Sequence, residues 1–168
     1  VHFTVLSKSQ IMQLDLFENM IIDSIVYRGE TCTFFREYDA FFIKFPQMFK
    51  VGARDKVRVY YHGSPTEALS PPWDGGFSWK NDKNGNPWIG VSCQGLGAST
   101  WWPCKDHQSD EPDSMRITCT VRNPWKIVSN GNLIKDTTEW NQYLNSWKFL
   151  FYLSHLIATL FSATINFL

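Results

Sequence analysis

The chain has 168 residues, which is enough for roughly one domain with a hydrophobic core of its own. Its 16 Lys and Arg residues balance its 16 Asp and Glu residues, and this zero net charge argues against a nucleic-acid-binding protein, which would carry a basic surface. Hydrophobic residues make up 43% and aromatic residues 16% of the chain, a composition that excludes a charge-rich disordered segment.

Residues 1 to about 133 read as short strands separated by turns. Val1–Val5 resembles the middle of a strand, so we expect the chain to be cut at its start, and its localisation stays unknown. Apolar and polar residues alternate with the period of half-buried strands in four further runs. These runs are Met12–Leu16, Phe41–Phe45, Val57–Tyr61 and Met115–Val121.

Turn-forming residues lie between these runs. The segment Lys83–Pro87 separates Phe77–Trp79 from Trp88–Cys93, an arrangement typical of a β-hairpin. No apolar stripe of helical period precedes residue 134. Many short strands with close turns predict an all-β, mostly antiparallel sandwich or barrel.

The cysteines are too few for a disulfide-dense scaffold. The four are Cys32, Cys93, Cys104 and Cys119. No two of them have the C-x-x-C spacing of a zinc knuckle or of a thioredoxin-like redox motif. We therefore expect free, partly buried thiols, because cysteine is often found inside proteins.

The last twenty residues, Phe149–Leu168, contain no charged residue. About 20 apolar residues are needed for a helix to cross the hydrocarbon core of a membrane. Six of the twenty are Ser, Thr, His or Asn, which weakens that interpretation because polar side chains oppose insertion. The sequence leaves three alternatives open: a membrane-associated helix, a helix docked on the sheet, or strands of an incomplete sheet.

No self-sufficient catalytic motif is found in the sequence. A zincin needs two histidines four residues apart with a glutamate between them, and none of the four histidines has such a neighbour. A G-x-S-x-G nucleophile motif and a P-loop are also lacking.

Two groups of residues could bind a ligand. Five tryptophans could form a platform for a sugar or an apolar ligand, although such residues more often fill a core or an interface. They are Trp73, Trp79, Trp88, Trp101 and Trp102. Four acidic residues offer oxygen ligands for Ca²⁺, but without the spacing of an EF-hand, which favours a solvated loop. They are Asp106, Asp110, Glu111 and Asp113.

The order of motifs between Tyr60 and Leu133 is distinctive. A Cys93-Gln94 pair with small residues precedes an aromatic-Pro-Cys-x-Asp stretch, then an acidic Asp-Glu-Pro loop, an alternating strand and a Val-Ser-Asn-Gly turn. In this order the chain resembles the amino-terminal domain of the M1 family of zinc metallo-aminopeptidases, which includes leukotriene A4 hydrolase. The resemblance covers about residues 3 to 133.

This resemblance implies a saddle-like, mostly antiparallel β-sandwich over residues 1–133, followed by a divergent apolar tail over residues 134–168. In the family this domain packs against the catalytic domain and closes one wall of the substrate cleft. Gln94 matches a glutamine that the family places near the amino end of the bound peptide. An amide suits that role, since it accepts from an ammonium group and donates to a carbonyl. Without the resemblance, Gln94 would merely satisfy backbone groups beside the Gly95–Gly97 turn.

The chain also departs from the family. It contains neither the H-E-x-x-H zinc motif nor the G-x-M-E-N strand that binds the free amine. We therefore expect a truncated, non-catalytic amino-terminal domain, with no cofactor in this chain and zinc in the catalytic domain of the parent enzyme. Its expected partners are that missing domain and a peptide at the shared cleft, not nucleic acid. The alternative is a stand-alone β-sandwich binding module, held at a membrane by Phe149–Leu168.

Overall fold

A computed structural model describes residues 1–71, 73–92, 95–107, 109–110, 112–122, 125–129, 132–139, 142–150 and 160–166. Within these ranges the regular elements are the strands β1 to β13 and one short 3-10 turn, η1 (Ala98–Thr100), with no α-helix among them. Nearly all strand pairs are antiparallel. The predicted all-β, mostly antiparallel fold class is therefore confirmed for the described residues.

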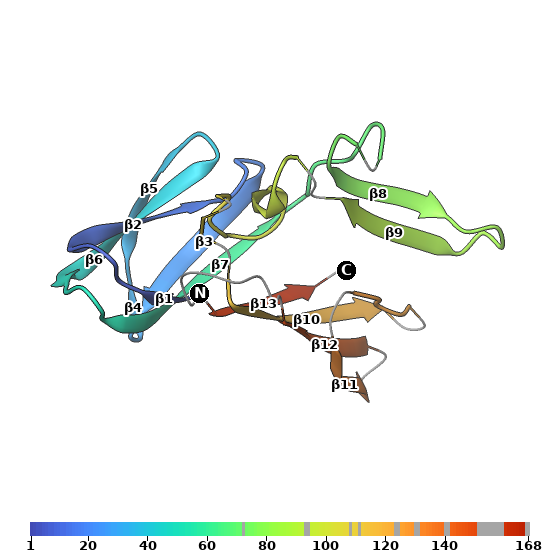
Figure 1. The fold of residues 1–168 in the computed structure, drawn as a ribbon. Coiled ribbons are helices and arrows are strands. Elements are labelled where there is room, and N and C mark those ends of the chain that lie inside the picture. Colours follow the sequence, from blue (N-terminus) through green and yellow to red (C-terminus); the bar gives the residue numbers. More distant parts are fainter. Residues whose placement is uncertain are drawn as a thin grey trace. The chain divides into compact units, whose positions relative to one another are not determined.

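The chain divides into two compact units (Figure 1). Unit 1 consists of Val1–Ser7, Val51–Lys56 and Gln108–Leu168, and unit 2 of Lys8–Lys50 and Val57–His107. The boundary expected near residue 133 stays a prediction.

Unit 2 contains two antiparallel sheets and a hairpin. One sheet has the order β2-β6-β5, and in the other β3 lies between β4 and the second part of β7. The hairpin is β8–β9. The strands are β2 (Ser9–Asp15), β3 (Met20–Tyr27), β4 (Glu30–Thr31), β5 (Thr33–Glu37), β6 (Ala40–Phe49), β7 (Arg54–Gly63), β8 (Gly76–Asn81) and β9 (Pro87–Ser92).

The core of unit 2 is formed by the inward residues of the alternating runs. Leu14, Phe41 and Ile43 are at most 1% exposed, which confirms the half-buried strands predicted at Met12–Leu16 and Phe41–Phe45. Burying one such side chain contributes about 1.5–3 kcal/mol. Aromatic rings extend this core, because Tyr27 contacts Phe45 edge to face at a centroid distance of 5.0 Å.

The strand β6 continues beyond Pro46, where the sequence pattern suggested an end. Proline has no N–H group for a sheet ladder, so it is tolerated at edges and bulges. The pairing of β5 with β6 begins only at Thr33 and Lys44, and the register of β2 shifts between Ser9 and Ile11. The proline therefore lies where the ladder is already interrupted on both sides.

Unit 1 has β10 (Ser114–Arg122) inside a four-stranded sheet with the order β11-β12-β10-β13 (Figure 1). Its partners are β11 (Asn132–Glu139), β12 (Gln142–Leu150) and β13 (Leu160–Asn166), and β13 pairs with β10 in parallel. A second ribbon of this unit pairs β1 (His2–Thr4) with Arg54–Lys56 of β7. The alternation predicted for β10 is confirmed by its buried residues Met115, Ile117, Cys119 and Val121.

The described parts of the C-terminal stretch take the strand alternative, and neither of the two helix alternatives is found in those parts. Phe149 and Leu150 end β12, and Leu160–Asn166 forms β13. Strand β13 pairs with one edge of β10, from Ser114 and Leu160 to Thr120 and Asn166. This pairing satisfies backbone N–H and C=O groups of both strands. Residues 151–159 and 167–168 lie outside the described residues. Among the described residues, no helix has the length and apolar character to cross a membrane.

Candidate functional site

Gln94, to which the sequence assigns peptide binding, lies outside the described residues, and so does Cys93. Its two flanks are described. Strand β9 ends before it at Ser92, and Gly95–Gly97 leads after it into η1. The second flank is held by a carboxylate.

The carboxylate of Asp106 holds the beginning of η1. Its Oδ1 accepts a hydrogen bond from the backbone N–H of Ala98 at 3.1 Å, and its Oδ2 accepts one from that of Ser99 at 3.2 Å. Gly97 lies directly against this carboxylate, since a Cβ atom at residue 97 would be 2.2 Å from both oxygens. The φ of Gly97 is +86°, so both the space and the backbone conformation require glycine there.

The same loop is attached to the end of β2. The N–H of Asp106 donates to Oδ2 of Asp15 at 2.9 Å. Asp15 and Cys104 exchange two backbone hydrogen bonds, of 2.7 and 3.1 Å. The N–H of Phe17 adds a third, to the carbonyl oxygen of Ser99 at 2.9 Å. The segment from Gly97 to Asp106 is thereby fixed to the core strands of unit 2.

Aromatic side chains pack beside η1. Phe77, which is 2% exposed, contacts Trp101 edge to face at 5.3 Å and stacks with Trp79 at 5.7 Å. Trp101 also contacts Trp102, at 4.3 Å. By contrast, Trp73 and Trp88 are 82% and 65% exposed. The five tryptophans singled out in the sequence therefore do not share one environment.

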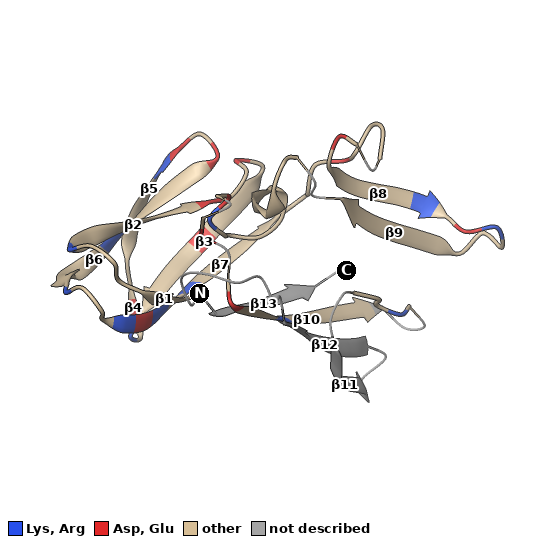
Figure 2. Cartoon of the chain, viewed as in Figure 1, with Lys and Arg blue, Asp and Glu red and all other residues tan. Residues whose placement is uncertain are grey.

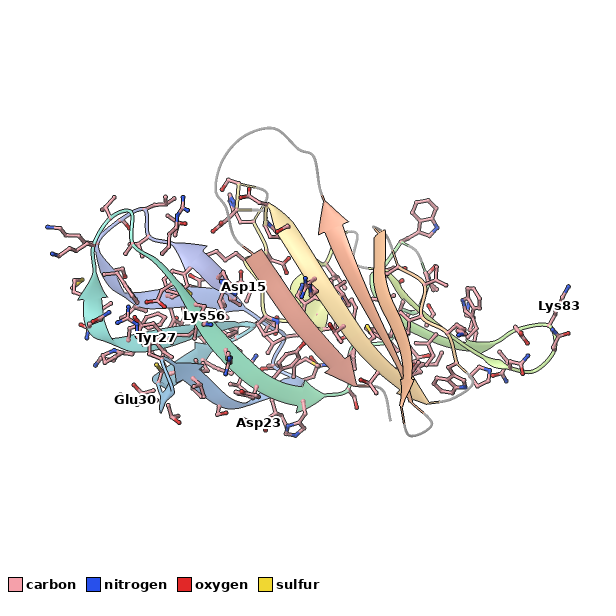
Figure 3. All side chains as sticks on the ribbon, turned by 90° about the horizontal axis from the view of Figure 1, so that it is seen from below. Asp15, Asp23, Tyr27, Glu30, Lys56 and Lys83 are labelled. Atoms are coloured by element: carbon pink, nitrogen blue, oxygen red, sulfur yellow. The ribbon has the colours of Figure 1, made fainter. Side chains whose placement is uncertain are left out.

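The predicted hairpin is confirmed, and Asp82 closes its turn. Oδ1 of Asp82 accepts from the backbone N–H groups of Asn84 and Asn86, both at 2.8 Å, and Oδ2 accepts from the side chain of Asn86 at 3.1 Å. These bonds, above all those from Asn86, lower the pKa of the Asp82 carboxyl because they stabilise its charged form. Figure 3 shows Lys83 at the tip of this hairpin.

Unit 1 contains a shallow cleft of about 410 Å³. Its polar lining comes mainly from the β1–β7 ribbon, where His2 pairs with Lys56 and Thr4 with Arg54. Burial, the amino terminus and Lys56 together lower the pKa of His2. Elsewhere in the described part of the chain, basic and acidic residues are interspersed (Figure 2).

No three His, Cys, Asp or Glu side chains of the described residues come together as a metal site. Of the acidic residues considered for Ca²⁺, Asp106 is committed to backbone N–H groups, and Glu111 lies outside the described residues. Cys32, Cys104 and Cys119 are buried, as expected, and none of these three described cysteines forms a disulfide. Burial raises the pKa of the Cys119 thiol to about 11.

Several solved structures share this fold. The M1 zinc metallopeptidase from Deinococcus radiodurans matches with a TM-score of 0.69 and 17% identity, over 84% of this chain and 31% of its own. A mutant of that Deinococcus enzyme bound to a Tyr-Ser-Ala substrate matches over 88% of this chain and 33% of its own, with a TM-score of 0.69 and 19% identity. Native yeast LTA4 hydrolase matches with a TM-score of 0.58 and 16% identity, over 86% of this chain and 22% of its own.

The chain has a fold that these metallopeptidases contain. The resemblance expected from the sequence is thus confirmed as a structural match over most of the chain. This chain spans about a third of the length of the Deinococcus enzymes and less of the yeast enzyme, a share of the size of one domain. No protein-family model matches the sequence, and no curated protein does so either.

The sequence pattern does not reveal the structural role of Asp106. In the sequence this residue stands in the aromatic-Pro-Cys-x-Asp stretch, close to other acidic residues. Asx-type motifs join an aspartate to backbone N–H groups within about four residues, so the nine residues between Gly97 and Asp106 hide the role from local sequence patterns.

Proposed function

We propose that this chain is a non-catalytic, saddle-like β-sandwich domain of an M1-type zinc metallo-aminopeptidase. The observation that carries the proposal is the match with the Deinococcus metallopeptidase over 84% of this chain at a TM-score of 0.69. The order of motifs between Tyr60 and Leu133, in which the chain resembles the family, also supports it. The intact parent enzyme would remove amino-terminal residues from peptides.

In this proposal the chemistry is divided between two domains. The catalytic domain of the parent would hold the zinc, which would supply a Lewis acid for the scissile carbonyl and for water. This chain contributes one wall of the cleft and the amide of Gln94, whose oxygen would accept from the free ammonium group of a peptide. The related structure that was solved with a bound Tyr-Ser-Ala substrate supports a short peptide as the ligand class.

Peptide titration of the isotope-labelled full chain tests this role, with the side-chain amide of Gln94 observed by NMR. Tyr-Ser-Ala is the probe, and its N-acetylated form, which has no ammonium group, is the control. We expect saturable shifts at Gln94 and about tenfold weaker binding of the acetylated peptide, since one charge-assisted hydrogen bond is worth about 1.5–3 kcal/mol.

The variant Gln94→Ala is expected to bind both peptides equally. Equal binding of both peptides by the unsubstituted chain, or no binding, would contradict the proposed role of Gln94.

The exposure of Trp73 and Trp88 favours a second candidate function, a stand-alone binding module. Large exposed apolar side chains mark an interaction site where they form one contiguous patch. A chain that is monomeric in its source and of 19.5 kDa would support this candidate. A native species several times heavier would favour the enzyme domain.

A further inference from the structure

We propose that the exposed face of the sheet β2-β6-β5 (Figure 1) binds the same face of a second copy of this chain, the two copies being related by a twofold axis. This inference goes beyond the proposed function and does not rest on it. It uses only strands of unit 2 and no residue to which peptide binding is assigned.

The three strands pair in a register that aligns their residues in rows. Strand β6 lies between β2 and β5, and residues directly opposite each other in an antiparallel pair lie on the same face. Leu14, Phe41 and Ile43 are at most 1% exposed and define the core face. The opposite face carries three rows: Ile11, Lys44 and Thr33; Gln13, Phe42 and Phe35; and Asp15, Ala40 and Glu37.

The middle row contains a solvent-exposed pair of aromatic rings. Phe35 and Phe42 stack with a centroid distance of 4.9 Å and an angle of 10° between the rings. Phe35 is 46% exposed, and so is Ile11 in the neighbouring row. Covering these side chains would remove apolar surface from water, which favours association.

The two outer rows carry opposite charges. Lys44 is at the centre of one row, whereas Asp15 and Glu37 are at the two ends of the other, on either side of Ala40. Four residues along β6 separate these rows, which corresponds to about 14 Å. Among the described residues, neither Lys44 nor Glu37 forms an ion pair. The face therefore has a positive end and a negative end with aromatic rings between them.

This order of charges makes the face complementary to itself. A twofold axis that crosses the strands at the middle row would bring Lys44 over Ala40 of the second copy, between two carboxylates. The phenylalanines of the two copies would then meet in the middle. A twofold axis along the strands would instead oppose Lys44 to Lys44. Only the first arrangement pairs opposite charges, and such complementarity favours an isologous dimer.

The small size of the face predicts a weak dimer. Its three rows on three strands cover about 14 Å along the strands and about 10 Å across them. Interfaces that bury less than about 1,200 Å² in total are typical of transient complexes. We therefore expect a dissociation constant on the order of 0.1 mM, so that the dimer forms only in concentrated solution.

Sedimentation equilibrium of the full chain, at concentrations up to about 1 mM, measures this dimer. Phe35→Ser should raise the dissociation constant about tenfold, because it removes apolar surface from the middle row. Lys44→Glu and Glu37→Lys, each alone, should weaken the dimer as well, since each opposes like charges across the interface. An equimolar mixture of these two charge variants should recover the dimer, because both contacts between the copies then join opposite charges.

The matched controls are Lys83→Glu and Glu30→Lys. They change the net charge of the chain by the same amounts, but at the tip of the β8–β9 hairpin (Figure 3) and in β4. Neither control, alone or in a mixture, should alter the dissociation constant. Trp88→Ser removes an exposed tryptophan outside the proposed interface and should leave the constant unchanged too. All four charged positions are exposed, so these variants should fold.

A dimer that the two charge variants weaken and that their mixture recovers supports the inference. A chain that stays monomeric at about 1 mM overturns it, and the face then serves another protein or none. A dimer that the controls weaken equally, or that the mixture does not recover, also overturns it, because the rows are then not opposed as described. None of these outcomes changes the peptide titration of Gln94, so the proposed function stands or falls separately.

Discussion

Gly97 and Gly85 have almost the same backbone conformation, with φ values of +86° and +83°, but different surroundings. A Cβ atom at residue 85 would meet nothing within 4 Å, whereas one at residue 97 would collide with the carboxylate of Asp106. Substitutions at these two residues therefore distinguish the cost of a left-handed backbone conformation from the cost of a steric clash.

We expect Gly85→Ala to lower the free energy of unfolding by about 1 kcal/mol, the cost of a left-handed conformation for a residue with a Cβ. Gly97→Ala should lower it by roughly 2 kcal/mol more, because displacing the carboxylate breaks its hydrogen bonds. Urea denaturation of the two variants measures the difference. Equal losses would mean that the contact with Asp106 contributes nothing.

The side chain of Arg36 is a second group that binds several backbone atoms at once. Its guanidinium group donates to the carbonyl oxygens of Leu16 and Phe17, which follow β2, and of Met20, which begins β3. Burial lowers the pKa of this arginine, although neighbouring acidic residues oppose the effect. One planar group thus binds three carbonyls, of which that of Phe17 also accepts a hydrogen bond from the N–H of Met20.

The variant Arg36→Lys should be less stable by about 2 kcal/mol, because an ammonium group cannot reach three carbonyls spread over that turn. The control is Arg28→Lys, since Arg28 lies over the ring of Tyr27 at 5.2 Å and should lose less than about 1 kcal/mol. Thermal unfolding compares the two. A larger loss for Arg28 would contradict this explanation.

At the scale of elements, strand β10 places the thiol of Cys119 on its buried face, where burial changes the pKa of the thiol. Cys119 is on the face shared by Met115, Ile117 and Val121, and burial there raises its pKa from 9.0 to about 11. The folded chain therefore keeps its proton at a pH where the unfolded chain has lost it. The stability that the neutral thiol contributes is fully present below pH 9 and is lost as the pH rises to about 11.

We expect the stability advantage of the unsubstituted chain over Cys119→Ala to shrink between pH 9 and pH 11. Urea denaturation of both proteins across this range is the measurement. All other titratable groups are common to both proteins and cancel in the difference. An advantage that stays constant would show that the thiol remains neutral in both states.

The elements also show which parts of the fold a sequence can predict. Strands with uninterrupted alternation, such as β2 and β10, were predicted because one face is buried and the other is not. Strand β3 was missed, since a register shift between Ile22 and Ser24 breaks its period of two. Strand β5 was missed because Phe34 and Phe35 are adjacent, and Phe35 is exposed in a stacked pair with Phe42.

The candidate site was predictable only in part. A resemblance could single out Gln94, since residue type and order are read directly from sequence. The link from Asp106 to Asp15 could not be predicted, because it joins residues 91 positions apart through one backbone N–H. Alternation and turn motifs report local structure, and such a pair leaves no local pattern.

At the scale of the whole molecule, we expect the purified chain to bind no stoichiometric zinc and to release no amino acid from an aminoacyl reporter. The sequence has no H-E-x-x-H motif, and no three potential ligands come together among the described residues. Metal analysis after dialysis against zinc, together with the reporter assay, checks both points. One bound zinc per chain with hydrolysis of the reporter would overturn the proposed division of labour.

The composition of unit 1 has a consequence for synthesis in the cell. Unit 2 is complete once His107 has been made, whereas unit 1 combines Val1–Ser7 and Val51–Lys56 with Gln108–Leu168. A ribosome adds about 5–20 residues per second, so the last segment takes roughly 3–12 seconds more. During that interval β1 and the first residues of β7 can pair with each other, but the sheet around β10 does not yet exist. At that stage the nascent chain thus contains all of unit 2, but it lacks most of the strands of unit 1.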